Sequence, residues 1–153
     1  MSYQIHLDTN CAREGLFPIV RRAATAALIH LHPQPGEITI LLTDAEKIQE
    51  LNKQFADHDY PTDVLSFADG SIDPGTEMMY FGDIVIAVDI AEAQADLAGH
   101  ALEAELALLS VHGILHLLGF DHENGEDKQA MWTHQAAILE ELSYSSVIPK
   151  VDA

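Results

Sequence analysis

The chain has 153 residues, of which 48% are hydrophobic, 25 are acidic and only 7 are basic, so its formal net charge is −18 at pH 7. This length and composition predict one globular domain spanning residues 1–153. Cys11 is the only cysteine, and the sequence shows neither an N-terminal targeting pattern nor an apolar run of about 18 residues, so we expect a cytoplasmic protein with no membrane partner.

The acidic excess counts against tight, unaided binding of nucleic acid. Such binding draws much of its affinity from Lys and Arg side chains that neutralise phosphates. The seven basic residues are scattered along the chain, and only Arg21 and Arg22 are adjacent. A bound metal ion would add local positive charge that the formal net charge omits.

The first third of the chain alternates between strand and helix patterns. Residues 33–36 contain two prolines and a glycine and form a firm break, and Asp44 is well suited to cap the helix that follows it. The expected elements are strands over residues 3–8 and 37–43 and helices over residues 15–32 and 45–55.

The remainder of the chain contains the most apolar segments. Residues 102–118 are apolar on nearly every helical face, which predicts a buried helix. Residues 69–77 hold two glycines and a proline and read as a loop. The other expected elements are strands over residues 64–68 and 83–88 and helices over residues 89–98 and 125–142. Four strands and about five helices predict an α+β fold.

Three histidines within eleven residues predict a metal site at the end of the buried helix. His112 and His116 share one helical stripe, and Gly119 follows the apolar pattern where a helix commonly ends, so the chain can bring His122 back as a third ligand. Three nitrogen ligands and an open position are typical of catalytic zinc, although nickel or copper would also accept them. The alternative is that these are hydrogen-bonded core histidines.

Candidates for a catalytic or substrate-binding role are fewer. Asp121 could orient a ligand or hold the metal-bound water, or it could cap a turn. The strand near residue 64 could lie along an extended substrate, with Ser66 donating to a phosphate and Asp63 as a further substrate contact. The alternative is that Asp63 only caps a turn and that the apolar residues of this strand are core. His58 is a further candidate for phosphate contact. The histidine spacing also matches a metalloprotease pattern, but Gly113 occupies the position of the glutamate base.

The stretch His-Gly-Ile-Leu-His-Leu-Leu-Gly-Phe-Asp-His at residues 112–122 resembles the signature of the YbeY family of metal-dependent endoribonucleases. Residues 51–52, 59–67 and 82–86 resemble other blocks of that family in the same order. The resemblance implies a mixed four-stranded sheet covered by helices, with a metal cleft beside the buried helix. It also implies a zinc-dependent, single-strand-specific endoribonuclease that matures the 3′ end of 16S ribosomal RNA and acts in ribosome quality control.

The sequence departs from this family at three positions. Members usually carry an arginine where this chain has Ala56, a lysine where it has His58, and a proline where it has Ala68. The missing arginine and the charge of −18 favour a second hypothesis, that of a ribosome-assembly factor with a mainly structural metal. Its partners would be a small-subunit ribosomal protein or an assembly GTPase.

Overall fold

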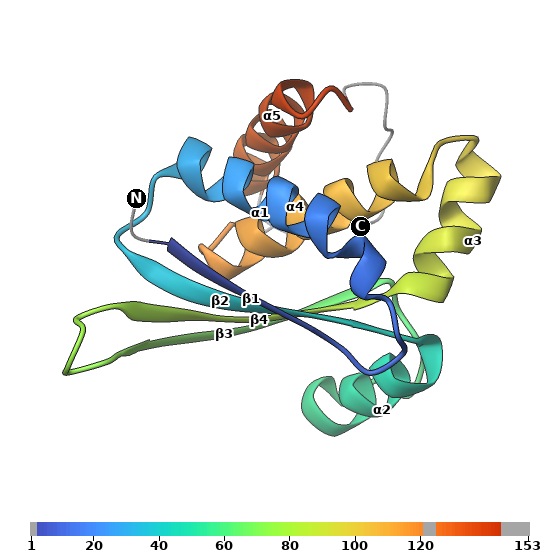
Figure 1. The fold of residues 1–153 in the computed structure, drawn as a ribbon, viewed down its shortest axis with the longest axis horizontal. Coiled ribbons are helices and arrows are strands. Elements are labelled where there is room, and N and C mark those ends of the chain that lie inside the picture. The colour runs from blue at the N-terminus through green and yellow to red at the C-terminus, as the bar shows by residue number, and fades with distance from the viewer. Residues whose placement is uncertain (1–2, 121–124, 145–153) are drawn as a thin grey trace.

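The structure is a computed structural model that describes residues 3–120 and 125–144 (Figure 1). Its strands are β1 (Tyr3–Thr9), β2 (Gly36–Thr43), β3 (Val64–Ile72) and β4 (Met79–Ala87). Its helices are α1 (Phe17–Leu31), α2 (Ala45–Ala56), α3 (Val88–Ala98), α4 (Leu102–Leu117) and α5 (Gly125–Glu141), and a short 3₁₀ helix, η1 (Glu14–Leu16), precedes α1. The predicted strands and helices are all present, with shifted ends.

The four strands form one mixed sheet in the order β1-β2-β4-β3. Strands β1, β2 and β4 run parallel, and β3 pairs with β4 in the antiparallel direction. Ile40 of β2 lies opposite Leu7 of β1 on one side and Ile84 of β4 on the other. The predicted α+β fold with a mixed four-stranded sheet and about five helices is therefore confirmed. Strand β3 is an edge strand of that sheet, called its terminal strand below.

The hairpin between β3 and β4 is longer than the sequence predicted. The loop predicted over residues 69–77 is wrong at its start, because β3 continues to Ile72. The next strand, predicted over residues 83–88, begins earlier, at Met79. The pairing of the two strands shifts between Ala68 and Ser71. The side chains of residues 68–72, at the end of β3, are all exposed and show no apolar alternation, so the sequence carried no strand signal there.

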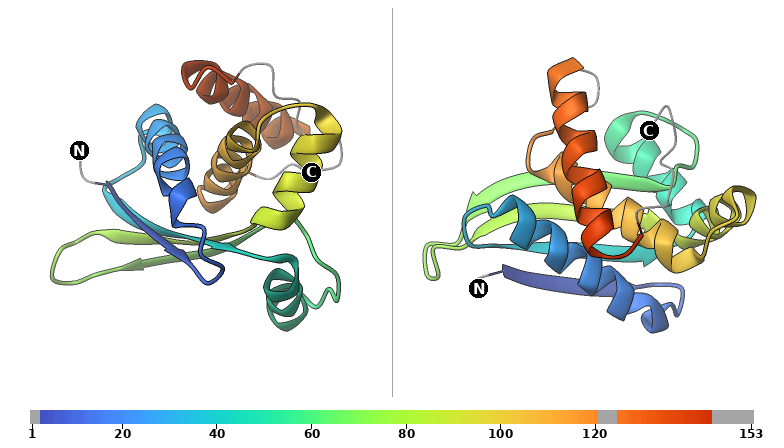
Figure 2. Two further views of the ribbon diagram at one scale, coloured as in Figure 1. Left: turned by 45° about the vertical axis from the view of Figure 1, so that its right-hand side comes forward. Right: turned by 90° about the horizontal axis from the view of Figure 1, so that it is seen from above.

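The core lies between the sheet and the helices on one of its faces (Figures 1 and 2). Helices α1 and α4 pack together over the sheet, and the buried alanines of α1 allow close approach of the two helices. Helix α5 lies farther from the sheet, against α4 (Figure 2). Helix α4 is buried along most of its length, as predicted. No helix in the described part of the chain is long and apolar enough to span a bilayer.

Helix α2 lies on the opposite face of the sheet and covers only one end of it (Figure 1). Asp44 caps this helix, and its side chain accepts a hydrogen bond of 2.9 Å from the backbone N–H of Lys47. Ile48 of α2 packs with Val85 and Ala87 of β4 in a small second core cluster. Among the described residues, no helix covers the rest of this sheet face (Figure 1).

Candidate functional site

His112 and His116 lie one turn apart on α4 and turn their rings toward each other. Their Nε2 atoms are 3.1 Å apart, and the ring centroids are separated by 4.7 Å with an interplanar angle of 72°. Both side chains are half-buried, whereas Gly113, Ile114 and Leu115 between them are buried. The structure therefore brings together two of the three predicted ligands on the stripe where the sequence placed them.

Gln135 of α5 contacts the other side of the His112 ring. Its Oε1 atom lies 3.1 Å from His112 Nδ1, and the side chain is only 3% exposed. Sequence reasoning missed this residue. A signal was present, because Gln135 lies one helical turn from the apolar Met131 and Ile138 and so falls on the buried face of α5. A polar side chain on a buried face needs a hydrogen-bond partner.

The chemistry of this pair fits a zinc ion. Two imidazole nitrogens that share a tetrahedral zinc ion are about 3.3 Å apart, close to the spacing seen between the two Nε2 atoms. The second ring nitrogen of His112 meets an amide oxygen, as is usual for a metal-ligating imidazole. His122 and Asp121 lie outside the described residues. Within the described residues, no group of three or more His, Cys, Asp or Glu side chains is arranged to hold a metal.

Gly113 occupies the position that carries the glutamate base in the metalloprotease pattern. A Cβ atom added there would lie 2.9 Å from Cγ2 of Ile84, closer than side-chain atoms normally approach. The position therefore faces the sheet and has no room for a carboxylate side chain. This packing weakens the metalloprotease alternative on structural grounds, independently of the family resemblance.

Ser66 of β3 contacts the backbone of the α4 turn that carries His112. Its hydroxyl donates a hydrogen bond of 3.3 Å to the carbonyl of Gly113, the residue that follows His112. This contact joins the terminal strand of the sheet to the helical turn that carries the first predicted ligand. Contact of Ser66 with a substrate phosphate remains a prediction, as does a cleft beside the histidine pair.

Asp63 is buried in a polar network instead of lying open on the sheet edge. It is 7% exposed, and Gln94 of α3, with its amide oriented to donate, bridges Asp63 Oδ2 at 3.2 Å and Glu105 Oε2 at 2.9 Å. The other oxygen of Glu105 lies 2.6 Å from His100 Nε2. The network ties the start of β3 to α3 and α4, so this position of Asp63 favours a structural role over direct contact with substrate.

His58 lies in the exposed loop that follows α2. Its ring packs at a tilt against Tyr60, with 5.3 Å between ring centroids. Asn52 of α2 is buried and holds this loop, because its side-chain amide donates to the Tyr60 carbonyl at 3.0 Å and its backbone carbonyl accepts from the His58 N–H at 3.1 Å. Ala56, the position of the family arginine, is exposed at the end of α2.

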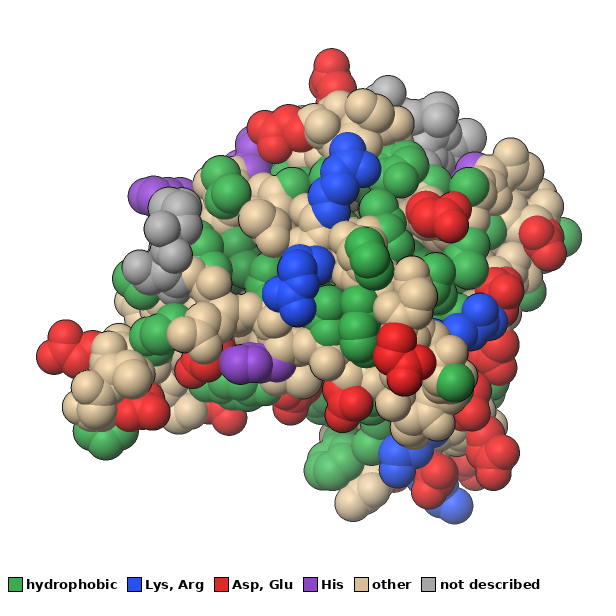
Figure 3. Space-filling view, viewed as in Figure 1, with side chains coloured by type: hydrophobic (Ala, Val, Ile, Leu, Met, Phe, Trp, Pro, Cys, Tyr) green, Lys and Arg blue, Asp and Glu red, His purple; other side chains and the backbone are tan. Residues whose placement is uncertain are grey.

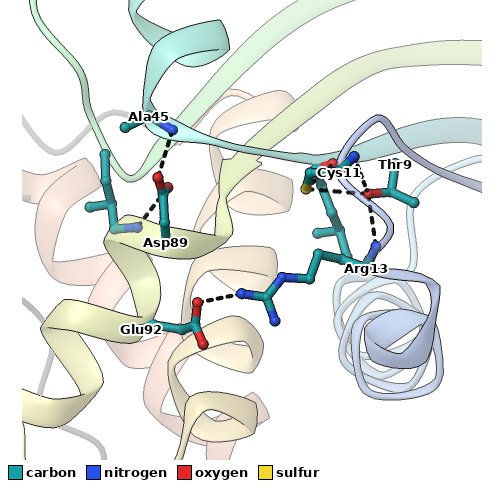
Figure 4. Close-up of polar contacts among 8 residues, drawn as sticks. Thr9, Cys11, Arg13, Ala45, Asp89 and Glu92 are labelled. Atoms are coloured by element: carbon teal, nitrogen blue, oxygen red, sulfur yellow. Dashed lines mark hydrogen bonds and ion pairs between the residues drawn. The ribbon is translucent and has the colours of Figure 1, made fainter.

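Most basic side chains of the described residues contact a carboxylate, a backbone carbonyl or an aromatic ring. Figure 3 shows Lys and Arg as separate groups on the visible face, among more numerous Asp and Glu side chains. Arg13 forms an ion pair with Glu92 of α3, close to the bond between Asp89 and the Ala45 N–H (Figure 4). The other engaged cations are Arg21 with the Ile5 carbonyl, Arg22 with the Leu142 carbonyl, Lys53 with Asp59 and Lys128 with the Trp132 ring.

A groove of about 440 Å³ lies beside α2 on the sheet face that this helix leaves open. The Phe55 and Phe67 rings meet edge to face at one side of it, with 5.6 Å between their centroids. Its lining contains two carboxylates and no Lys or Arg. The lining residues are Asp8, Thr39, Leu41, Leu51, Phe55, Phe67, Asp83, Ile84 and Val85.

Tyr80 anchors the polar side of this groove. Its hydroxyl donates to Asp83 and lies 2.6 Å from Thr39 Oγ1. Burial of the ring, reinforced by the hydrogen bond to Asp83, raises the pKa of Tyr80 from 10.0 to about 12. The phenol therefore stays protonated and holds the Asp83 carboxylate in place at the rim.

Comparison with known sequences gives a consistent result. A sequence model described as endoribonuclease YbeY matches residues 6–143. The chain is 40% identical over 136 residues to an endoribonuclease YbeY of Staphylococcus saprophyticus, a match that covers 86% of this chain and 89% of that protein. It is 38% identical over 151 residues to an endoribonuclease YbeY of Brevibacillus brevis, covering 90% and 94% of the two chains.

The fold also resembles a known structure. The chain superposes on the solution structure of a Thermotoga maritima protein with a TM-score of 0.57. The superposition covers 96% of this chain and 98% of that one, at 24% sequence identity. At this identity the likeness supports the fold alone.

Proposed function

The chain belongs to the YbeY family of endoribonucleases, and we propose on this basis that it is a zinc-dependent endoribonuclease specific for single-stranded RNA. Its proposed substrate is precursor ribosomal RNA, which it matures at the 3′ end of the 16S RNA, and its wider role is ribosome quality control. The observation that carries the proposal is the convergence of the His112 and His116 Nε2 atoms at 3.1 Å. His122 is the proposed third ligand.

The proposed chemistry needs only groups that the histidine pair can support. A bound zinc ion would supply a Lewis acid for a phosphoryl oxygen and lower the pKa of a water molecule from about 15.7 toward 7. His112 and His116 would hold it as neutral ligands. Phosphodiester hydrolysis is the better fit than peptide hydrolysis, because position 113 cannot carry a general base and phosphoryl transfer depends strongly on positioning and charge stabilisation.

The substrate would approach along β3. This strand ends the sheet in the observed order, and Ser66 places it against the turn that carries His112. We propose that Ser66 and, at the entry to the strand, His58 contact the RNA. Asp63 would act by fixing the start of β3 through its buried network, and Asp121 is proposed as the group that orients the attacking water.

A cleavage assay tests this function. The zinc-loaded protein is incubated with a small-subunit ribosomal RNA precursor, beside His116→Ala and, as a matched control at an exposed histidine of β1, His6→Ala. Wild type and His6→Ala are expected to cut the RNA, and His116→Ala is expected to be inactive while keeping a folded circular dichroism spectrum. Equal cleavage by His116→Ala would refute a catalytic metal at this pair.

The open sheet face favours a second candidate function, that of a ribosome-assembly factor. The groove beside α2 combines apolar walls with Asp8 and Asp83, and its lining has no cationic side chain. Such a surface is complementary to a basic, partly apolar protein segment, and the chain charge of −18 acts in the same direction. We propose a small-subunit ribosomal protein as the partner; an assembly GTPase is the alternative.

Binding measurements separate this candidate from the nuclease. Purified small-subunit ribosomal proteins are titrated against wild type, the double variant Asp8→Asn with Asp83→Asn, and the control Asp96→Asn on exposed α3. The double variant is expected to lose affinity for the partner while the control keeps it. Cleavage by a variant that no longer binds the partner would show that the two functions are independent.

A further inference from the structure

The hydrogen bond between Gln135 of α5 and His112 has a defined donor and acceptor. Gln135 Oε1 can only accept a hydrogen bond, so the Nδ1 atom of His112, at 3.1 Å, must be the donor. A neutral imidazole carries one proton. The contact therefore fixes the His112 tautomer with the proton on Nδ1 and the lone pair on Nε2, which faces His116.

We propose that Gln135 is a positioning residue for the metal: it locks His112 in the tautomer and ring orientation that present Nε2 as a ligand. This inference rests on the metal site of the proposed function and adds a residue from a different helix to it. Gln135 does not touch the metal or the RNA; it acts through His112.

The surroundings of Gln135 make it a firm support. Its side chain is 3% exposed, and Met131 and Ile138, which flank it at one helical turn, are both fully buried. A buried amide has few rotamers available and cannot exchange its partner for water without leaving the core. Any rotation of the His112 ring would leave this amide oxygen without its donor, a cost that holds the ring in place.

The choice of an amide also has an electrostatic consequence. A carboxylate at this position would add a negative charge beside the ligand and raise its basicity, whereas an amide orients the ring and leaves the charge unchanged. The site then keeps more of the positive character of a bound cation. This matters in a chain of charge −18 that must attract a phosphate.

The test compares two isosteric variants with a matched control. Gln135→Met keeps the shape and removes the acceptor, and Gln135→Glu restores a stronger acceptor. Gln94→Met makes the same change in a hydrogen-bonded glutamine of α3 that does not contact the histidine pair. Zinc affinity is measured by competition with a chromogenic chelator, the His112 tautomer in the metal-free protein by nitrogen-detected NMR, and stability by denaturant unfolding.

We expect Gln135→Met to weaken zinc binding by about 10- to 100-fold and to lose the Nδ1-protonated tautomer. Gln135→Glu should bind zinc as tightly as wild type or more tightly, and Gln94→Met should bind it as wild type does whatever its stability. Unchanged affinity and tautomer in Gln135→Met, or equal losses in the Met and Glu variants, would overturn the proposal. Wild type that binds no zinc refutes the metal of the proposed function, and the tautomer measurement then decides the role of Gln135 alone.

Discussion

The Ser66 hydroxyl donates to the carbonyl of Gly113 across the boundary between sheet and helix, at 3.3 Å. This is a specific link between the terminal strand β3 and the turn of α4 that starts with His112. This side-chain hydrogen bond therefore fixes the position of the strand proposed to receive the RNA relative to the helix proposed to hold the metal. A shift of either element would break the bond.

Ser66→Ala is expected to lower the free energy of unfolding by about 1 kcal/mol, because one half-buried hydrogen bond is lost. Zinc affinity should stay within about threefold of wild type, since the hydroxyl does not touch the imidazoles. Urea unfolding and the chelator competition measure both quantities. Ser71→Ala, on the exposed arm of the same strand, is the control and should change stability by less than about 0.5 kcal/mol. A fully stable Ser66→Ala protein would contradict the link.

Gly113→Ala is expected to destabilise the protein by about 1–3 kcal/mol, because the new methyl group would lie 2.9 Å from Ile84 in a packed core. The matched control is Gly15→Ala, where an added Cβ atom meets nothing within 4 Å. Thermal and urea unfolding of the two variants give the comparison. Equal stability of the two would show that α4 can move away from β4 at no cost.

Ala56→Arg should tighten the binding of single-stranded RNA and steepen its salt dependence by about 0.7 in log–log slope, the value for one added phosphate contact. The residue is exposed at the C-terminal end of α2, where a cation is also favourable to the helix. Ala98→Arg at the exposed end of α3 is the control for added charge alone. Equal gains in the two variants would assign the effect to net charge and not to position 56.

Tyr80→Phe should make stability less sensitive to alkaline pH. The folded protein holds the pKa of Tyr80 at about 12, above its ordinary value of 10.0, so the unfolded chain loses this proton first as pH rises. The contribution of Tyr80 to stability is therefore complete below pH 10 and is lost between pH 10 and about 12. Unfolding measured over this range should show a steeper decline in wild type than in Tyr80→Phe. Parallel declines would contradict the raised pKa.

The sequence predicted the features that follow from strong periodicity. Helix α4 was recognisable because residues 102–118 are apolar on nearly every face, and the i, i+4 spacing placed His112 and His116 on one stripe. The mixed sheet followed from the family resemblance, since strand patterns alone do not give strand order or direction. The sequence did not predict the hydrogen-bond partners of the histidine rings, because these partners depend on how two helices pack.

Three features had weak or no sequence signals. Gln135 comes from a helix 23 residues after His112 in the chain, and only its place on a buried face hinted at a partner. The end of β3 is exposed, and residues 68–72 contain aspartate, glycine and serine with Ile72 as the single β-branched residue, so the sequence did not mark it as strand. The burial of Asp63 was also unforeseen, because its partners Gln94 and Glu105 lie on later helices.

The irregular arm of β3 has a consequence for how the protein behaves at high concentration. A terminal strand exposes unpaired backbone groups that invite a second copy to extend the sheet. Here the pairing of β3 with β4 shifts between Ala68 and Ser71. Within this short segment, Gly70 adopts a positive φ of 91° and Asp69 adds a carboxylate. The regular row of backbone donors and acceptors is thereby interrupted beyond Ala68, and the Asp69 carboxylate would repel the same residue of a second copy. These two features disfavour aggregation by strand addition at the sheet edge that is proposed to receive RNA.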